Sequence, residues 1–324
     1  MRAEVAAPGR PGAGWRIVAA KELADHLVSL RLSVLLVIVV LAALGSVYAT
    51  SGEIRSAAEE ASGTPMLFIR LFTVPGERFP SLLSMLGFLV PLLGLAFGFD
   101  AVSSERAQRT LPRLVAQPIH RDDVINGKFV ASLAVIAATL LCLALLVAGL
   151  GILRLGIAPT GEEVARIAAW YVLTVAYAGV WLGFATFLSV VLRRASTAAL
   201  VSIAVWLVLT LFSSFLVGLV ADAIAPLPAR PTAEEVLARA RAELWLGRIS
   251  PQGIYDEATG VLLNPEVRTA GILLPEQVDR AIPTPLSLEQ SLLAVWPQIV
   301  ALLALLAGAF AASYVAFMRQ EIRA

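Results

Sequence analysis

The sequence predicts an all-α polytopic membrane protein. We expect six transmembrane helices, an N-terminal amphipathic elbow helix and a helical extracytoplasmic insertion between spans 5 and 6. Three observations predict this fold class: a mean hydropathy of +0.81, a charged fraction of only 15%, and an uneven placement of the charges. Soluble domains carry roughly 25% charged residues. The composition therefore excludes an ordinary soluble enzyme.

Six stretches contain no Asp, Glu, Lys, Arg or His, and they bracket the length of about 20 apolar residues that a helix needs to cross a bilayer. They are residues 32–48, 81–99, 129–153, 167–192, 195–221 and 291–318. Every charged residue falls in the rest of the chain, which has the charge density of an ordinary protein surface. We expect these stretches to be the six spans.

The segments between the spans set the predicted domain limits. Residues 1–14 are rich in Ala, Gly and Pro and are expected to be disordered. Over 15–31, polar residues recur at helical spacing among apolar ones, which favours an elbow helix on the membrane surface and a plain juxtamembrane helix equally. Residues 32–221 hold spans 1–5, with a cytoplasmic loop at 100–128. Residues 222–290 form the extracytoplasmic insertion, and residues 291–324 form the last span and the cytoplasmic C-terminus.

The placement of Lys and Arg predicts the orientation. If the N-terminus is inside, the inside segments hold fourteen of these residues and the two short outside loops hold five. The long fifth loop is left out of the comparison, because long loops cross largely regardless of charge. This asymmetry predicts a multi-pass protein of the cytoplasmic (inner) membrane with both termini in the cytoplasm.

Two further loops carry local structure. In the insertion, Thr232 and Glu235 form a capping box that opens a helix ending near Gly247. Ser250 followed by Pro251 predicts a second helix, which runs to about residue 263. In the first loop, residues 66–72 are apolar enough to predict a segment lying at the membrane interface.

Several kinds of chemistry are excluded. Two histidines and one cysteine are too few for a histidine- or thiolate-based metal site, and the net charge of +1 gives no sign of nucleic-acid binding. The chain has no GxxxxGK[ST] motif, and its spans carry none of the ionisable residues that ion-coupled carriers place in the bilayer. We therefore expect no cofactor in this chain. A transport function would need energy from another chain that binds ATP.

The loop between spans 2 and 3 is the most informative segment. Thr110 can cap a short helix in which Leu111 and Leu114 share an apolar face, and Pro118 would end that helix. A short amphipathic helix flanked by charges suits docking into a groove on a partner. Composition alone leaves this interpretation and a solvated loop about even.

The run from Phe99 to Lys128 reads Phe-Asp-x4-Glu-Arg-x3-Thr-Leu-x2-Leu-x3-Pro-x2-Arg-x5-Gly-Lys. It resembles the loop of ABC transporter permeases of the type-2 (drug and polysaccharide exporter-like) class, in the branch that contains the permease for copper-site maturation of nitrous oxide reductase. The residues around Ser250–Tyr255, 262–265 and 317–323 are also similar to members of that branch. One departure is Arg109, where relatives commonly have Gly, so the start of the helix is not fixed by the resemblance.

The resemblance implies a permease subunit rather than an enzyme, paired with a second permease subunit as a homodimer or heterodimer. Two copies of a separate ABC ATPase would bind ATP and Mg and drive export, and the 100–128 loop would be the coupling helix that docks on them. The residues that the resemblance assigns to this coupling are Glu105, Arg106, Arg109, Thr110, Leu111, Leu114, Arg121, Asp122 and Lys128. The sequence leaves open a non-transporting scaffold that meets an extracytoplasmic protein through residues 222–290.

Overall fold

The computed structural model describes residues 14–60, 66–76, 79–108, 120–156, 158–228, 230–264 and 285–320. Its helices are α1 (Gly14–Leu27), α2 (Leu30–Glu60), α3 (Arg70–Thr73), α4 (Leu82–Gly98), α5 (Ser103–Ala107), α7 (Arg121–Leu155), α8 (Gly161–Val191), α9 (Ala195–Leu211), α10 (Ser213–Ile224), α11 (Ala233–Gly247), α12 (Pro251–Leu263) and α14 (Leu288–Arg319). These described ranges contain no strand, and the predicted all-α class is confirmed. The expected disorder over 1–14 lies, apart from Gly14, outside them.

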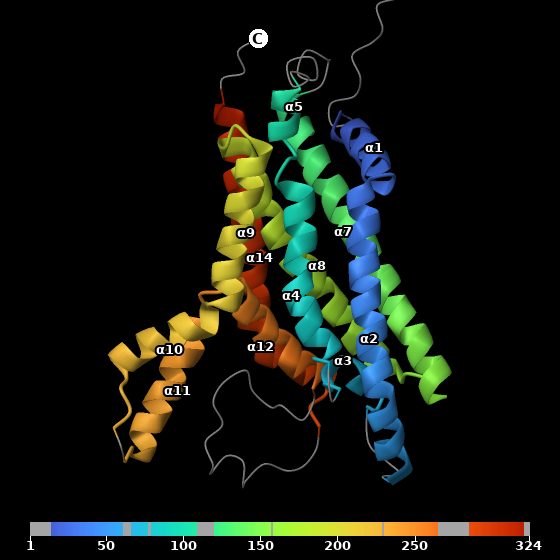
Figure 1. Cartoon of the computed structure of the whole chain (residues 1–324), viewed down its shortest axis with the longest axis vertical. Coiled ribbons are helices and arrows are strands. Elements are labelled where there is room, and N and C mark those ends of the chain that lie inside the picture. The colour runs from blue at the N-terminus through green and yellow to red at the C-terminus, as the bar shows by residue number, and fades with distance from the viewer. Residues whose placement is uncertain are drawn as a thin grey trace, which may run out of the picture.

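The long helices form one elongated bundle (Figure 1). Helix α1, helix α5, the start of α7 and the end of α14 lie together at one end, which we call the termini end. Helices α3, α10, α11 and α12 lie toward the opposite end, which we call the far end. The segments that the sequence predicts to be cytoplasmic therefore share one end of the bundle.

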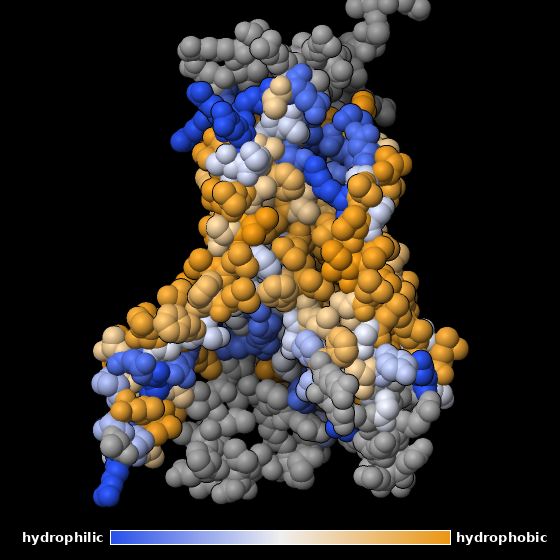
Figure 2. Space-filling view, in the orientation of Figure 1, coloured by the Kyte–Doolittle hydropathy of each residue, from blue (hydrophilic) through white to orange (hydrophobic). Residues whose placement is uncertain are grey.

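The apolar surface has the form expected of a membrane protein. In the described part of the chain, α2, α4 with α5, α7, α8 and α14 are long and apolar enough to cross a membrane, and α9 with α10 adds a sixth span if that bent pair counts as one. Figure 2 shows apolar residues around the middle of the molecule and hydrophilic residues gathered toward its ends. Several spans confirm a multi-pass membrane protein.

Helix α8 is the most buried of these spans, and glycines allow its neighbours to approach it closely. A methyl group at Gly94 of α4 would lie 2.5 Å from the carbonyl oxygen of Ala178 on α8. A methyl group at Gly98, one turn further along α4, would lie 2.7 Å from Cβ of Ala185 on the same helix. On another side of α8, a methyl group at Gly183 would lie 2.9 Å from Cβ of Ala309 on α14. Gly94 with Gly98, and Gly179 with Gly183, each have the GxxxG spacing, and both pairs therefore pack helices within one chain.

The fifth predicted span is broken. The sequence predicted one uninterrupted helix over 195–221, whereas α9 ends at Leu211 and α10 leaves at an angle of 57°. The hydroxyl of Ser250 donates a hydrogen bond to the carbonyl of Leu209 at 2.9 Å, which satisfies an acceptor at the end of α9. Helix α10 packs against α11, where Arg239 donates to the carbonyl of Gly218 at 3.3 Å. Contacts from the 222–290 segment therefore hold the bend between α9 and α10.

The first loop also differs from its prediction. Helix α2 continues to Glu60, well past the predicted end of span 1. The segment 66–72 packs against the protein, where Phe68, Leu71 and Phe72 are buried. Glu163 of α8 accepts hydrogen bonds from the backbone N–H groups of Phe68, at 2.8 Å, and Ile69, at 3.3 Å. A buried carboxylate on a distant helix therefore fixes this loop.

Helix α1 is separate from α2 and rests on α7. The sequence predicted a helix over 15–31, whereas α1 ends at Leu27 and the hydroxyl of Ser29 donates to the carbonyl of His26 at 2.7 Å between the two helices. A methyl group at Gly127 of α7 would lie 2.7 Å from the carbonyl oxygen of Trp15. Glycine at 127 therefore lets α1 approach the start of α7 at backbone distance.

Candidate coupling site

The residues that the resemblance assigns to ATPase coupling fall into two groups. Arg109, Thr110, Leu111 and Leu114 lie outside the described residues, in the 109–119 segment. Glu105, Arg106, Arg121, Asp122 and Lys128 are described, and they flank that segment at the termini end. The structure therefore describes the base of the predicted coupling loop.

A buried lysine organises this base. Nζ of Lys128, near the start of α7, lies 2.9 Å from Oε1 of Glu22 on α1 and 2.7 Å from Oε1 of Glu105 on α5. The side chain of Lys128 is only 6% exposed. Lys21 lies 3.0 Å from the same Glu22 oxygen but is largely exposed. We call Glu22, Glu105 and Lys128 the Lys128 cluster; it joins three helices that are distant in sequence.

The electrostatics of the Lys128 cluster follow from this burial. A buried ammonium is stable only when it is paired and hydrogen-bonded, and here it meets two carboxylates. Burial alone would raise the pKa of Glu22, but the ion pairs and hydrogen bonds with Lys128 and Lys21 together outweigh that effect and lower it. Glu22 therefore stays ionised at neutral pH, and the cluster acts as a fixed link between α1, α5 and α7.

A second contact joins the two sides of the 109–119 segment to the end of α14. Arg106 of α5 donates to the side-chain oxygen of Gln320 and, at 3.3 Å, to the carbonyl of Val190 at the end of α8. Arg121 of α7 donates to the backbone carbonyl of Gln320 at 2.8 Å. The guanidinium of Arg121 also lies 5.9 Å from the centre of the Phe317 ring. The two arginines that flank the segment therefore meet at one residue, Gln320.

The remaining contacts fix helix α5 and the start of α7. The hydroxyl of Ser189 on α8 accepts the backbone N–H groups of Val102, at 3.0 Å, and Ser103, at 3.1 Å, at the start of α5. At the start of α7, a carboxylate oxygen of Asp123 accepts the N–H of His120 at 3.1 Å. Asp122, which the resemblance assigns to ATPase coupling, is the preceding residue and is half-buried. The capping carboxylate of this helix is therefore that of Asp123.

Sequence reasoning missed several residues of this site. Glu22 was assigned only to the polar face of the elbow helix, and Ser189 to the inside of a span. Gln320 received no role, and Asp123 was placed only at the start of the helix that re-enters the membrane. The sequence signal that could have found Glu22 is Lys128 itself, a charge directly before an uninterrupted apolar run, since such a lysine needs a carboxylate partner.

The far end is tied to the bundle by a buried arginine. Arg166 of α8 is completely buried and donates to the carbonyl of Leu262 at the end of α12 at 2.8 Å. It also donates to the hydroxyl of Ser291, in the first turn of α14, at 3.1 Å and to the carbonyl of Leu286, just before that helix. Glu162 lies 2.9 Å from the same guanidinium. Helix α12 is therefore bound rigidly to α8 and α14.

These features define a class of protein: an all-helical, multi-pass membrane protein whose long spans meet in a polar, interlocked cluster at one end. Among the described residues, no group of three or more His, Cys, Asp or Glu could hold a metal ion. A family model described as ABC-2 family transporter protein matches residues 16–322. The chain belongs to this family, and it is a transporter membrane subunit.

A curated relative agrees with this assignment. The chain is 29% identical over 145 residues to a Stutzerimonas stutzeri protein named as a probable ABC transporter permease, NosY. The match covers 43% of this chain and 51% of the relative, so the chain spans about half the length of the curated relative that it matches.

Proposed function

We propose that the chain is the membrane-spanning permease subunit of an ABC exporter in the cytoplasmic membrane, with both termini in the cytoplasm. A separate ATPase subunit, in two copies, binds ATP and Mg and docks on the 109–119 segment of each permease subunit. Closure of the ATPase pair displaces that segment and thereby moves the spans. This chain supplies no catalytic group to the hydrolysis.

The Lys128 cluster is the observation that carries this proposal. Glu105 precedes the 109–119 segment and Lys128 follows it, and their side chains are joined at 2.7 Å. Glu22 ties the same lysine to α1, so a displacement of the segment cannot be absorbed by its two ends alone. Interlocked elements of this kind move as rigid bodies, which is how a local displacement becomes a rearrangement of helices.

Co-purification with the ATPase encoded beside this chain tests the docking assignment. The double variant Leu111→Asp/Leu114→Asp places two charges on the predicted docking face, and we expect it to lose the ATPase. The matched control is Val236→Asp/Ile249→Asp, which adds the same two charges at exposed apolar positions of the far end. It should retain the ATPase. Equal retention by the two double variants would remove the coupling assignment.

A second function is supported by the burial of Arg166. Because α12 is bound to α8 and α14, force on the spans would also reach the 222–290 segment. That segment could then act on an extracytoplasmic protein without any substrate crossing the membrane. Deletion of α11 (Ala233–Gly247), which has no buried residue and leaves α12 in place, distinguishes the two functions. A transporter is expected to keep nucleotide-dependent stimulation of its ATPase, whereas a scaffold would lose all activity.

A further inference from the structure

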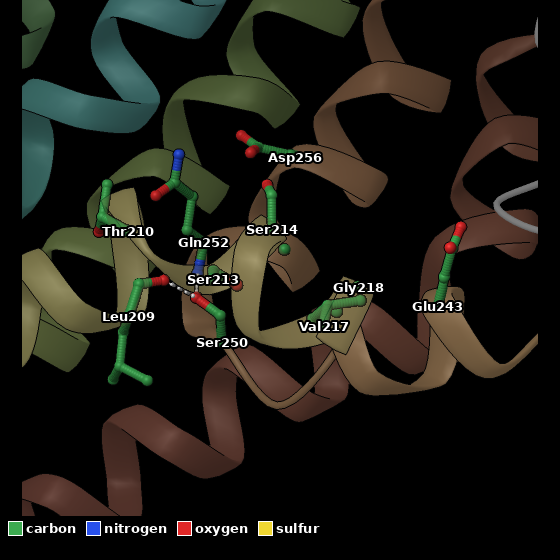
Figure 3. A pocket seen from close by; sticks show the side chains of 12 residues that line it. Leu209, Thr210, Ser213, Ser214, Val217, Gly218, Glu243, Ser250, Gln252 and Asp256 are labelled. Carbon is green, nitrogen blue, oxygen red and sulfur yellow. Dashed lines mark hydrogen bonds between the residues drawn. The ribbon is translucent and has the colours of Figure 1, made fainter. Parts of the chain in front are cut away.

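A cavity of about 400 Å³ lies at the far end, beside the break between α9 and α10 (Figure 3). Its walls come from the end of α9, the start of α10, and helices α11 and α12. An adjoining cavity of about 730 Å³ shares Glu243, Gly247, Gly253 and Asp256 with it. We call the two together the Asp256 cleft. Its volume suits a small molecule or a lipid headgroup.

The polar side chains around the smaller cavity can all accept hydrogen bonds, and those of Glu243 and Asp256 only accept them when ionised. Figure 3 shows Asp256, Gln252, Ser214 and Thr210 gathered on one side of it. Within the described residues, the side-chain oxygens of Gln252 and Thr210 are buried without a hydrogen-bond partner. The last turn of α9, with Leu209 and Thr210, also lies here, and the carboxyl end of a helix carries a partial negative charge. Unpaired acceptors are costly, so the cavity is suited to a ligand that donates hydrogen bonds.

The charges of the cleft leave one carboxylate without a cation. Glu243 lies 2.6 Å from Arg239, and Glu257 lies 2.9 Å from Arg248. Asp256 forms no salt bridge in the part of the chain that the structure describes, and its side chain is exposed to the cleft. Its carboxylate interacts with the side chain of Gln252. Among the residues that the structure describes, no cation therefore pairs with this carboxylate, which lies beside the buried oxygens of Gln252 and Thr210.

We propose that the Asp256 cleft binds a primary ammonium group. The carboxylate of Asp256 is its counter-ion, and the oxygens of Gln252 and Thr210 accept its N–H groups. A primary ammonium has three donors and no acceptor, which matches this set of side chains. A quaternary ammonium, which has no N–H group, would leave both oxygens unpaired. The site goes beyond the permease function proposed above and does not depend on the ATPase.

The ionisation of Asp256 is consistent with such a ligand. The surrounding protein removes water from the carboxylate, which raises the pKa of Asp256 to about 6. A bound cation would offset the cost of that lost hydration. The same chemistry is available from two sources: a soluble amine, or the headgroup of an aminophospholipid in the outer leaflet.

Calorimetric titration of the purified full chain, in nanodiscs of phosphatidylcholine, tests the site. The probe is ethanolamine, and choline is the matched probe without N–H groups. We expect ethanolamine to bind at least about tenfold more tightly than choline, because each charge-assisted hydrogen bond is worth a factor of that order. Asp256→Asn should weaken ethanolamine binding by about tenfold or more.

Two more variants complete the design. Gln252→Met keeps the charge of the cleft and removes one acceptor, so it should weaken ethanolamine binding less than Asp256→Asn does. Glu234→Gln makes the same change of charge at an exposed position of α11 that does not line the cleft, and it should bind ethanolamine like the unaltered chain. Thermal unfolding of each variant establishes that it is folded.

Nanodiscs that contain phosphatidylethanolamine distinguish a lipid headgroup from a soluble amine as the source of the ammonium group. If the cleft takes a lipid headgroup, that lipid competes with free ethanolamine and stays bound to the unaltered chain, but not to Asp256→Asn, in native mass spectrometry. If the cleft takes a soluble amine, the lipid changes nothing and ethanolamine binding persists. The proposal is overturned if neither source binds, if choline binds as tightly as ethanolamine, or if folded Asp256→Asn binds ethanolamine unchanged.

Discussion

The ammonium of Lys128 and the carboxylate of Glu105 lie 2.7 Å apart, with 6% and 12% of their side chains exposed. Glu105 precedes the 109–119 segment and Lys128 follows it. Their ion pair closes the base of that segment, and Glu22 extends it to α1. A displacement at the segment therefore reaches α1, α5 and α7 together.

Lys128→Met should destabilise the protein strongly. The substitution leaves the carboxylates of Glu22 and Glu105 without their buried cation, and removing one partner of a buried ion pair costs about 3–5 kcal/mol. Lys21→Met is the matched control, because Lys21 pairs with the same Glu22 from the surface. Thermal unfolding in detergent measures both. Similar melting temperatures for the two variants would mean that Lys128 does not hold the helices together.

Arg166→Lys should loosen α12 from the bundle. A lysine has the charge but not the planar fork that reaches the carbonyls of Leu262 and Leu286 at once. Hydrogen exchange over residues 251–263 should become faster, while exchange in α4 stays slow. Arg241→Lys, at an exposed position of α11, is the control. Unchanged protection of 251–263 in Arg166→Lys would show that other contacts fix α12.

Gly94→Ala should lower stability by about 1–3 kcal/mol, because the added methyl group would lie 2.5 Å from the carbonyl oxygen of Ala178. Gly308→Ala is the matched control on α14, where nothing lies within 4 Å of the added methyl group. Alanine is a better helix former than glycine, so this control should be neutral or stabilising by up to about 1 kcal/mol. A melting temperature for Gly94→Ala at or above that of Gly308→Ala would contradict the close approach of α4 and α8.

Asp256 should contribute a loss of stability as the pH rises from about 4 to about 6. Desolvation raises the pKa of Asp256 from the ordinary value of 3.8 to about 6. Between these values the folded state binds more protons than the unfolded state, so raising the pH favours unfolding. The charged groups facing it across the cleft are Glu243, Arg248 and Glu257.

Asp256→Asn removes this titration and should flatten the profile of melting temperature against pH in that window. The comparison uses Glu234→Gln, whose profile should follow that of the unaltered chain. A profile for Asp256→Asn that still falls between pH 4 and 6 as steeply as the others would assign the pH dependence to different groups.

The sequence was sufficient for the features that depend on local chemistry. Charge-free runs predicted the spans, because the bilayer imposes the same requirement on each of them. The starts of α11, α12 and α14 follow from the caps Thr232, Ser250 and Ser287, whose hydroxyls accept backbone N–H groups within the next turn. Such signals need no knowledge of the rest of the fold.

The sequence was not sufficient where the structure depends on contacts between residues that are far apart in the chain. The break after Leu211 has no proline or glycine to announce it, and the residue that satisfies the end of α9 is Ser250, 41 positions away. Likewise, Lys128 and Glu22 are separated by 106 positions, and only the packing of α1 on α7 brings them together. Arg166 was counted only among the charges that orient the chain, because its burial depends on α12 and α14.

The distance between two spin labels at the far end tests the central claim most directly. Cysteines replace Leu153 and Ile249, which are 81% and 71% exposed, and Cys142 is replaced by alanine. In nanodiscs with the ATPase, ATP trapped by vanadate should change the distance distribution, and Leu111→Asp/Leu114→Asp should abolish the change. Two results would contradict the claim that the ATPase moves the spans through the 109–119 segment. One is a distance distribution that ATP does not change in the full complex, and the other is a change caused by ATP in this chain without the ATPase.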